Sequence, residues 1–331
     1  ASATDCTALQ LVADLTVCRQ RVKGEPLQSI ADLQKADERA AIYLTASLSA
    51  STKRAYSSDL AHFLAWGGTI PADPELVARY LALHGENLSP FTLARRLIAI
   101  GKAHGAQNLA NPCDNELVRS VLRGIRRVHG SAQRQVDPLL KEDVLAVIDA
   151  LPPTLKGTRD RALLLVGFAA ALRRSELVGL NVEDVKFVPE GLILRLRRSK
   201  TDQEGEGRDI GIPYARSRAC PVKALRAWLD QAGITAGPIF RGVGKSGHIQ
   251  PSRMTSQSVA LVIKHNAAKV GLDPERFSGH SLRAGLITSA AKLGVSTYKI
   301  RQQSGHRSEA TLTKYIRDGE LFLMNAAGAV L

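Results

Sequence analysis

The chain has 331 residues, of which 44% are hydrophobic, so it can bury a sizeable core and is long enough for two domains. Lys and Arg number 45 against 31 Asp and Glu, and the formal charge of +14 favours a polyanionic partner such as nucleic acid. The sequence has no apolar run of about 18 residues, which excludes a membrane-spanning helix, and its 5% aromatic content argues against a protein that stacks single-stranded bases.

The first part of the chain consists of a weakly patterned segment, residues 1–37, expected to be an N-terminal arm or a short helix, and a helical region, residues 38–128. Apolar residues in the second segment recur with helical spacing, and no strand pattern occurs there. Four helices are expected, with starts at Ser51 or Thr52, at Pro74, at Ser89 with Pro90 in the first helical position, and at about Asn115. The region is therefore predicted to be a small helical domain.

The boundary between domains is predicted at residues 129–138, where the sequence HGSAQRQVDP loosens into glycine, serine and proline. No acidic residue lies between Leu117 and Val136. The arginines of this interval are Arg119, Arg123, Arg126, Arg127 and Arg134. A basic helix end that continues into a basic linker suits a chain that crosses a DNA backbone, and a solvated surface face is the alternative.

Residues 139–331 are predicted to form a mixed second domain. Helices are expected at 140–150, 159–171, 220–232, 256–270, 281–293, 297–303 and 309–317. The segment GLILRLRRSKTDQEGEGRDIGIP differs, because apolar residues alternate on both sides of a polar, glycine-rich turn. It predicts a β-hairpin with Lys200 near the turn. The expected fold class is therefore mainly α with a small antiparallel β-sheet (α+β).

Three motifs resemble sites of other enzyme classes, and each lacks something essential. GHSLRAG would need glycine in place of Arg283 to be the nucleophile elbow of a serine hydrolase. GVGKS would need glycine in place of Ile239, and a following helix, to be the phosphate-binding loop of an ATPase. His280 and His306 have no Cys, Asp or Glu at metal-ligand spacings, so no metal site is expected.

The segment AAKLGVSTYKIRQQSG, residues 290–305, predicts two short helices that meet at Gly294, as in a helix-turn-helix. A DNA-binding regulator without catalytic activity would account for this segment and for the net charge. That alternative leaves the polar residues on both sides of the segment unexplained.

Those residues suit phosphoryl chemistry. They are Arg173 and Glu176 in GFAAALRRSEL, Lys200 in RRSKT, His280 and Arg283 in GHSLRAG, His306 in SGHRS, and Tyr315 in TLTKYIR. Any one of them alone would most simply be an ordinary surface or core residue. Their order Arg, Lys, His-x-x-Arg, His, Tyr within about 143 residues is not expected by chance.

Breaking a phosphodiester without a metal ion needs such a set. Fixed donors must meet the charge on the non-bridging oxygens, and Arg173 and Arg283 can do so bidentately, with the two histidines as further donors. The hydroxyl of Tyr315 can attack in line and form a covalent phosphoryl-enzyme. The leaving sugar oxygen needs a proton, which Lys200 can give.

The stretches RDRALLLVGFAAALRRSELVGL, HSLRAG and SGHRSEATLTKYIR resemble the three signature boxes of the tyrosine recombinase (phage integrase) family, and all the active-site positions are occupied. The resemblance covers the second domain well and the helical region more loosely. It implies the following roles: Tyr315 as nucleophile, Lys200 as general acid, Arg173, His280, Arg283 and His306 as transition-state stabilisers, and Glu176 as their support.

The resemblance also implies a C-shaped clamp around DNA, with 38–128 as the core-binding domain and 139–331 as the catalytic domain and its C-terminal tail. It implies site-specific recombination at inverted-repeat sites, through a 3′-phosphotyrosyl intermediate and a Holliday junction. Monomers would assemble into a homotetramer on double-stranded DNA, with no metal, ATP or other cofactor. A type IB topoisomerase shares the chemistry and is the enzymatic alternative, although the short helical domain favours a recombinase.

Contacts with DNA are expected from both domains. The candidates are Lys53, Arg54, Ser89, Thr92, Arg95, Arg96, Arg119, Arg123, Arg126, Arg127, Arg253 and Gln257. Base reading is expected at two helix starts, after Ser89 and after Thr255, because Gln257 suits adenine in the major groove. The apolar cluster 321–324 in the tail is expected to dock into a neighbouring protomer or, alternatively, to fold back on its own domain.

The four cysteines, Cys6, Cys18, Cys113 and Cys220, are widely separated, which predicts reduced thiols. The N-terminus does not resemble a signal peptide, because acidic residues interrupt it. The expected location is the cytoplasm, at the nucleoid, in a bacterial, phage or mobile-element context.

Overall fold

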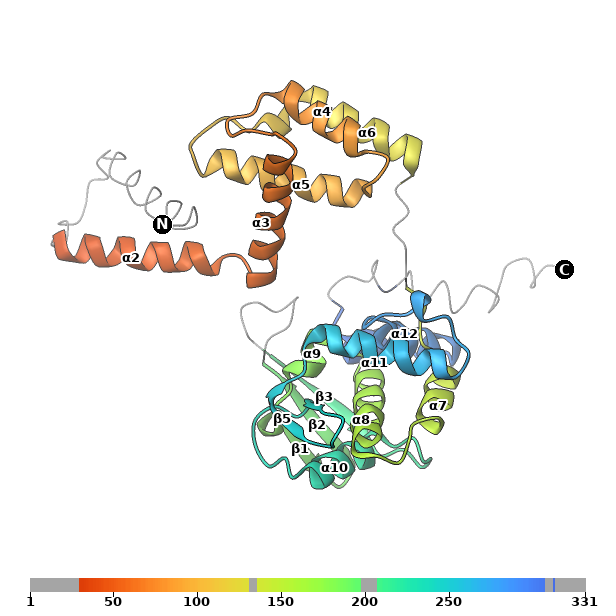
Figure 1. Ribbon diagram of the computed structural model, residues 1–331. Coiled ribbons are helices and arrows are strands. Elements are labelled where there is room, and N and C mark those ends of the chain that lie inside the picture. The colour runs from red at the N-terminus through yellow and green to blue at the C-terminus, as the bar shows by residue number, and fades with distance from the viewer. Residues whose placement is uncertain (1–29, 131–135, 198–206, 307–311, 313–331) are drawn as a thin grey trace. The chain divides into compact units, whose positions relative to one another are not determined.

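The computed structural model describes residues 30–130, 136–197, 207–306 and 312, and it divides the chain into two compact units, 1–134 and 135–331 (Figure 1). Within these described ranges, no helix is both long and apolar enough to cross a membrane.

The described part of the first unit is helical. Its elements are α2 (Ile30–Ala46), α3 (Ala50–Ala65), α4 (Pro74–His84), α5 (Pro90–Gly105), a 3-10 turn (Pro112–Asp114) and α6 (Glu116–His129). The predicted starts of α4, α5 and α6 are confirmed. The predicted start of α3 at Ser51 or Thr52 is wrong, because the hydroxyl of Ser49 caps this helix by accepting the Thr52 backbone N–H at 3.2 Å.

An apolar core joins α3, α4, α5 and α6. Phe63, Tyr80, Leu81, Leu93 and Ile100 are each 0% exposed. Burying one such side chain contributes about 1.5–3 kcal/mol, so this set outweighs the weak intrinsic preference of each short helix.

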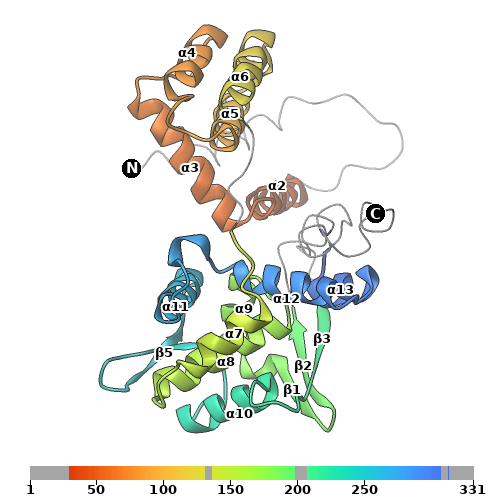
Figure 2. The same ribbon diagram turned by 90° about the vertical axis from the view of Figure 1, so that its right-hand side faces the viewer.

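The second unit combines helices with two small antiparallel sheets (Figure 2). Its helices are α7 (Lys141–Asp149), α8 (Leu155–Ala169), α9 (Arg174–Gly179), α10 (Pro221–Ala232), α11 (Ser256–Lys269), α12 (Ser281–Lys292) and α13 (Thr297–Ser304). Its strands are β1 (Val185–Val188), β2 (Gly191–Leu196), β3 (Arg208–Pro213), β4 (Arg241–Val243) and β5 (Ile249–Arg253). The first three strands form one sheet in the order β1-β2-β3, and the last two form the other.

The mixed character of this unit is as predicted, and most of its predicted elements are found. The predicted hairpin is β2 and β3, in which Leu194 pairs with Ile210. The β4–β5 hairpin was not predicted. It contains the GVGKS stretch in its turn, where no helix follows, so this stretch is not a phosphate-binding loop. The helix predicted at 309–317 lies outside the described residues except for position 312.

Helix α8 occupies the centre of the second unit. Its residues Leu163, Leu164 and Val166 are all 0% exposed, and α10, α12 and α7 pack around it. Its second half, residues 162–169, is accordingly an unbroken apolar run, ALLLVGFA, rather than an amphipathic stripe. Its end therefore provides a rigid base for the segment that follows, residues 170–173.

Candidate active site

The turn after α8 presents Arg173 at the start of α9. Ala171 adopts a left-handed conformation with φ of 49°, which ends the α8 helix sharply. Glu176 then accepts two hydrogen bonds from Arg173, one from its backbone N–H at 2.9 Å and one from Nη1 at 2.6 Å. The Arg173 side chain is 17% exposed and that of Glu176 is 3% exposed, so the carboxylate fixes the guanidinium while leaving it accessible.

Arg283 lies on α12 and is completely buried. Its Nη1 donates to the carbonyl oxygen of Ala171 at 2.7 Å and to that of Ser304 at 2.5 Å. One guanidinium therefore joins the α8–α9 turn to the end of α13. The negative end of the α13 dipole favours a cation at this position.

His306 follows α13, and its ring nitrogens contact Ser304 and Arg283. Its Nδ1 lies 2.8 Å from the Ser304 hydroxyl, and Arg283 Nη2 lies 3.1 Å from Nε2 and 3.2 Å from Nδ1. Because Nη2 is almost equidistant from the two ring nitrogens, it lies over the face of the ring, and a guanidinium stacked in this way favours a neutral imidazole over a second cation.

Electrostatics give the same answer for His306. Burial, together with the charges of Arg283 and Arg173, lowers the pKa of this histidine from 6.5 to about 3. The charges of His280 and Arg208 lower the pKa of His306 further. The imidazole is thus neutral at physiological pH and keeps a single N–H to donate.

His280 stands at the N-cap position of α12, three residues before Arg283. Its backbone N–H donates to the hydroxyl of Ser278 at 3.2 Å, and its carbonyl accepts the first bond of the helix from Ala284 at 3.0 Å. The half-buried residue is therefore anchored at a rigid helix start, and its charge acts on His306.

Arg208 is a site residue that the sequence analysis missed. It begins β3, and its guanidinium donates to the carbonyls of Gln302 at 3.2 Å, Gln303 at 3.0 Å and Ser304 at 3.3 Å. Burial lowers the pKa of Arg208. A signal was present in the sequence, since Arg208 follows the glycine-rich turn that carries Lys200 and heads the second strand of the predicted hairpin.

Lys200 and Tyr315 both lie outside the described residues. Leu312, three positions before Tyr315, is described and is 0% exposed. It packs in one cluster with Ile287 of α12 and Ile300 of α13. The chain is thus anchored shortly before the predicted nucleophile, on the helices that carry Arg283 and precede His306.

Among the DNA-binding candidates, one group presents exposed side chains: Lys53, Arg54, Ser89, Arg95, Arg119, Arg123, Arg126, Arg127, Arg253 and Gln257. Thr92 is half-buried at the start of α5. Arg119 and Arg123 pair with the acidic residues Asp114 and Glu116 at the start of α6. Arg126 and Arg127, at the other end of α6, are exposed, have no acidic residue within ion-pair distance in the described structure, and are the stronger candidates for phosphate contact.

Arg96 does not fit the expectation of a DNA contact. Only 8% of the residue is exposed, and its Nη1 donates to the Tyr80 hydroxyl at 2.8 Å and lies 2.9 Å from His62 Nδ1. Arg95, its exposed neighbour, makes a bidentate pair with buried Asp59, with distances of 2.6 and 3.0 Å. We therefore assign Arg96 to the interior of the first unit.

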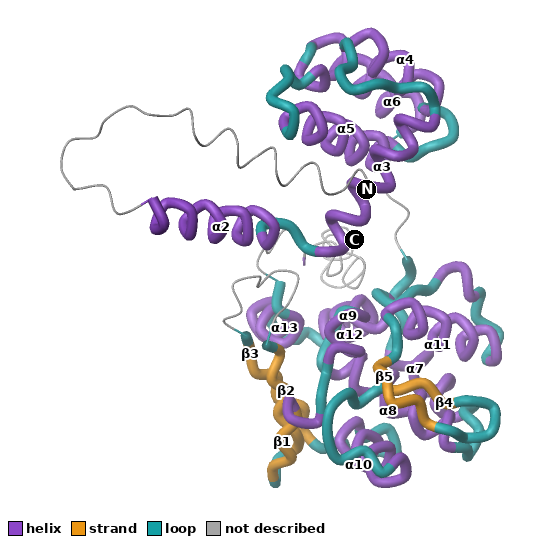
Figure 3. Tube along the Cα trace, turned by 60° about the vertical axis from the view of Figure 1, so that its left-hand side comes forward, coloured by secondary structure: helices purple, strands orange, loops and turns teal. Residues whose placement is uncertain are grey.

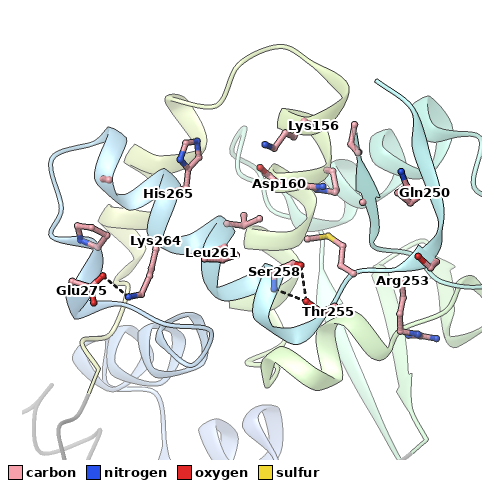
Figure 4. A pocket seen from close by; sticks show the side chains of 18 residues that line it. Lys156, Asp160, Gln250, Arg253, Thr255, Ser258, Leu261, Lys264, His265 and Glu275 are labelled. Atoms are coloured by element: carbon pink, nitrogen blue, oxygen red, sulfur yellow. Dashed lines mark hydrogen bonds and ion pairs between the residues drawn. The ribbon is translucent and has the colours of Figure 1, made fainter. Parts of the chain in front are cut away.

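A hollow of about 780 Å³ lies between α8, the β4–β5 hairpin and α11 (Figure 4). At its edge Thr255 caps α11, as predicted, by accepting the Ser258 N–H at 3.1 Å. Arg253 donates to the Val178 carbonyl and to Asn181 Oδ1, so its guanidinium joins β5 to the end of α9. The exposed Gln257 stands in the first turn of α11, beside this basic hollow.

The arrangement is suited to binding and polarising an anion. Arg173, Arg208 and Arg283 bring three positive charges around a neutral histidine, and Glu176 supplies one compensating negative charge. Within the described ranges, no group of three or more His, Cys, Asp or Glu residues could hold a metal ion. An α+β unit with such a site is of the kind that phosphoryl-transfer enzymes need.

Comparison with known proteins identifies the family. The phage integrase family matches residues 138–320. An integrase/recombinase XerD homologue from Selenomonas ruminantium is 39% identical over 286 residues, which are 83% of this chain and 84% of that protein. A tyrosine recombinase from Synechococcus elongatus is 28% identical over 291 residues, which are 81% and 84% of the two chains. The chain belongs to the phage integrase family and is a tyrosine site-specific recombinase.

Solved structures support the fold. A XerH recombinase in a post-cleavage complex with a palindromic difH substrate matches with a TM-score of 0.60 and 16% identity, covering 97% of this chain and 94% of that one. A lambda integrase dimer bound to a COC′ core site matches with a TM-score of 0.55 and 15% identity, covering 86% and 94%.

Proposed function

We propose that this recombinase cuts and rejoins duplex DNA through a 3′-phosphotyrosyl bond to Tyr315, with a Holliday junction between the two rounds of strand exchange. The observation that carries the proposal is the convergence of Arg173, Arg283 and His306 from three different elements on one anion site. Such a site stabilises the charge of a phosphoryl transition state.

The phosphate would contact the accessible Arg173, and the buried charge of Arg283 would lie behind it. Arg173 presents donors from a fixed position, because Glu176 holds its guanidinium and its backbone together. Arg283 is rigid because two carbonyls accept from its Nη1. Donors that need no rearrangement at the moment of reaction are more effective than mobile ones.

The covalent step exchanges one phosphodiester bond for another. The Tyr315 hydroxyl releases its proton to solvent as its oxygen attacks phosphorus, the bond from phosphorus to the 5′-oxygen breaks, and Lys200 gives that oxygen its proton. In the second step a 5′-hydroxyl of the partner strand attacks the phosphotyrosine and returns its proton to Lys200, and the tyrosine leaves and regains a proton from solvent. The bond energy is retained throughout, so the reaction needs no ATP and, in this proposal, no metal.

His306 contributes a neutral hydrogen bond rather than a charge. Its pKa near 3 means that the free enzyme does not hold an imidazolium beside the arginines. A bound phosphate adds negative charge and opposes this shift, so DNA binding should raise the pKa of His306. His280, at the start of α12, is the further donor on the same side of the site.

The proposed partner is double-stranded DNA that carries inverted-repeat recombination sites. Phosphate contacts would come from α6, through Arg126 and Arg127, and from Lys53 and Arg54 near the start of α3. Base reading would come from Gln257 in the first turn of α11. Free monomers would assemble into a homotetramer on paired sites, in the cytoplasm at the nucleoid.

The experiment that tests this function is selection of covalently trapped DNA. The protein is incubated with nicked duplexes of random sequence in the presence of EDTA, adducts are isolated under denaturing conditions, and the attached strands are sequenced. The proposal predicts a recurring inverted-repeat sequence with protein on the 3′-phosphate. Adducts on the 5′-phosphate, adducts without sequence preference as from a topoisomerase, or binding without adducts as from a regulator would each contradict it.

A further inference from the structure

Arg208 connects two parts of the second unit that are far apart in sequence. It pairs with Leu196 across the hairpin, so it stands at the point where β2 and β3 lead into the turn that carries Lys200. Its guanidinium extends from the sheet to the last carbonyls of α13, about 95 residues further along the chain. Figures 2 and 3 show α13 beside the start of β3.

At the end of α13, the Arg208 guanidinium donates the hydrogen bonds that the N–H groups of a continuing helix would otherwise supply. The carbonyls of Gln302, Gln303 and Ser304 belong to the last turn, where no later N–H of the helix can reach them. Arg208 donates to all three, at 3.0 to 3.3 Å, and its charge lies at the negative end of the helix. These three bonds offset the cost of burying its charge.

Gly305 allows this approach. It caps α13 in the left-handed conformation, with φ of 68°, which a glycine adopts without strain. A Cβ atom at this position would lie 2.7 Å from Cζ of Arg208. The guanidinium therefore packs directly on the residue that turns the chain from α13 into His306.

The same contact reaches His306 through Ser304. The Ser304 carbonyl accepts from Arg208 and from Arg283, and its hydroxyl lies 2.8 Å from His306 Nδ1. Ser304 is 0% exposed, so all three contacts are made by a residue shielded from water. A shift of Ser304 would move the histidine relative to Arg283, which the carbonyl of Ala171 still holds in place.

We propose that Arg208 is a positioning residue of the recombination reaction, which sets His306, through Ser304 and Gly305, against Arg283. The proposal rests on the catalytic role proposed above for His306. Arg208 acts through protein groups, because the three hydrogen bonds described for its guanidinium all go to backbone carbonyls. A lysine would present one point charge with tetrahedral donors in place of a planar fork, so it should substitute poorly.

The test is a double-mutant cycle on strand cleavage. Single-turnover cleavage of a nicked site is measured at saturating enzyme for wild type, Arg208→Ala, Arg208→Lys, His306→Ala and the double variant Arg208→Ala/His306→Ala. Arg208→Ala should slow cleavage by about 100-fold, as a small misplacement in a site can, and leave half-site affinity within about 2-fold. In the His306→Ala background the same change should cost less than about 3-fold, because its target is already absent.

Arg195→Ala is the matched control. Arg195 lies on the same hairpin and pairs with the exposed Asp209 at 3.1 Å, so its replacement removes the same charge from the same strands without touching α13. The control should cleave within about 2-fold of wild type, and Arg208→Lys should remain at least about 10-fold slow. Circular dichroism and thermal melts confirm that the compared variants are folded.

Three results would overturn the proposal. If the fold-decreases in cleavage rate of Arg208→Ala and His306→Ala multiply in the double variant, the two residues act independently. Full recovery of Arg208→Ala on a 5′-bridging phosphorothiolate, whose leaving group needs no acid, would show that Arg208 serves the proton donor instead. Equal slowing by Arg195→Ala would show that Arg208→Ala slows cleavage only because the hairpin loses a positive charge. Loss of the wild-type adduct itself would instead contradict the proposed function, so the two failures are distinguishable.

Discussion

Arg173 and Arg283 carry the same charge in the site, but the protein holds them differently. Arg173 is partly exposed and is fixed by one carboxylate, whereas Arg283 is buried and fixed by two carbonyls. Sequence reasoning selected both residues, because Arg in these motifs suits phosphate. It could not separate an accessible arginine from a buried one, since that difference depends on how α8, α12 and α13 pack.

Because Arg173 is the accessible arginine, its replacement tests the role of an arginine in cleavage most directly. Arg173→Ala should slow cleavage by about 10²- to 10³-fold, the cost of one transition-state donor, while affinity for duplex DNA changes little because binding is spread over many phosphates. Single-turnover cleavage and gel-shift titration on one site measure the two effects. Equal losses of rate and affinity would show that Arg173 is an ordinary backbone contact.

Arg283→Ala is expected to behave differently. It leaves the carbonyl of Ala171 without a donor in a buried place and removes one of the two donors of the Ser304 carbonyl, and an unsatisfied buried group costs about 1–3 kcal/mol. The free energy of unfolding should therefore fall together with the cleavage rate. Arg173→Lys, which keeps a cation beside the buried Glu176 carboxylate, should slow cleavage and leave the free energy of unfolding nearly unchanged. Urea unfolding of Arg283→Ala and Arg173→Lys beside wild type measures the difference, and equal stability of both would contradict it.

The pKa of His306 predicts a pH dependence of stability. In the folded protein this pKa is lowered from 6.5 to about 3, first by burial and then by the neighbouring arginines. As the pH falls below about 6.5, the unfolded chain takes up a proton at His306 and the folded protein does not. This contribution to the free energy of unfolding is thus complete above pH 6.5 and is lost progressively toward pH 3.

Urea unfolding at pH 7.0, 6.0 and 5.0 measures this contribution when wild type is compared with His306→Gln, which cannot titrate. Wild type should lose more free energy of unfolding over this range than His306→Gln, because only wild type gains the extra proton on unfolding. Parallel pH profiles for the two proteins would show that the pKa of His306 is not lowered in the folded state.

At the scale of elements, local chemistry explains which parts were predictable. Pro74 and the caps Ser89 and Thr255 mark helix starts that depend only on neighbouring residues. The six-residue α9 is too short to show a periodic signal. Its Glu176 is buried because it pairs with Arg173, and such a pair gives no apolar pattern in the sequence. Strand β1 and the β4–β5 hairpin consist mostly of half-exposed residues, so their sequences lack clear alternation.

Two helices of the first unit that carry adjacent arginines, α5 and α6, test how far sequence position predicts function. Arg96→Met on α5 should lower the melting temperature, because the Tyr80 hydroxyl and His62 lose their shared donor, at about 1–3 kcal/mol. It should leave the salt dependence of DNA affinity unchanged.

Joint replacement of Arg126 and Arg127 by Ala on α6 should have the reverse effect. Stability should change by less than about 0.5 kcal/mol, and the slope of log affinity against log salt should fall by about 0.9 for each phosphate that the variant no longer neutralises. Thermal melts and gel shifts at several salt concentrations compare the two variants. A reduced salt slope in Arg96→Met with an unchanged melting temperature would reverse the assignment.

The whole molecule consists of two units, one with an apolar helical core and one with the proposed site. Length and charge indicated two domains and a polyanionic partner before any motif was considered. The order of catalytic residue types indicated the family, because it spans most of the second unit. Arg208 was not found this way, since its role appears only when β3 and α13 are adjacent.

Assembly is the property of the whole molecule that the C-terminal tail should control. Deleting residues 320–331 should leave binding to a single half-site within about 2-fold, and it should abolish cooperative binding to full sites and pairing of sites. The reason is that the apolar cluster 321–324 is proposed to dock into a neighbouring protomer. Gel-shift titrations on half-sites and full sites separate these effects. Loss of half-site binding would show that the tail folds on its own domain, and unchanged cooperativity would show that it does not connect protomers.

The central claim is that Tyr315 forms the covalent bond to DNA, and one measurement tests it directly. Wild type and Tyr315→Phe are incubated with the same nicked recombination site, and protein-linked DNA is counted on a denaturing gel. Removing one oxygen deletes the nucleophile and little else, so Tyr315→Phe should bind the duplex with wild-type affinity and form no adduct. An adduct that persists in Tyr315→Phe, or no adduct from wild type on a site that it demonstrably binds, would contradict the account.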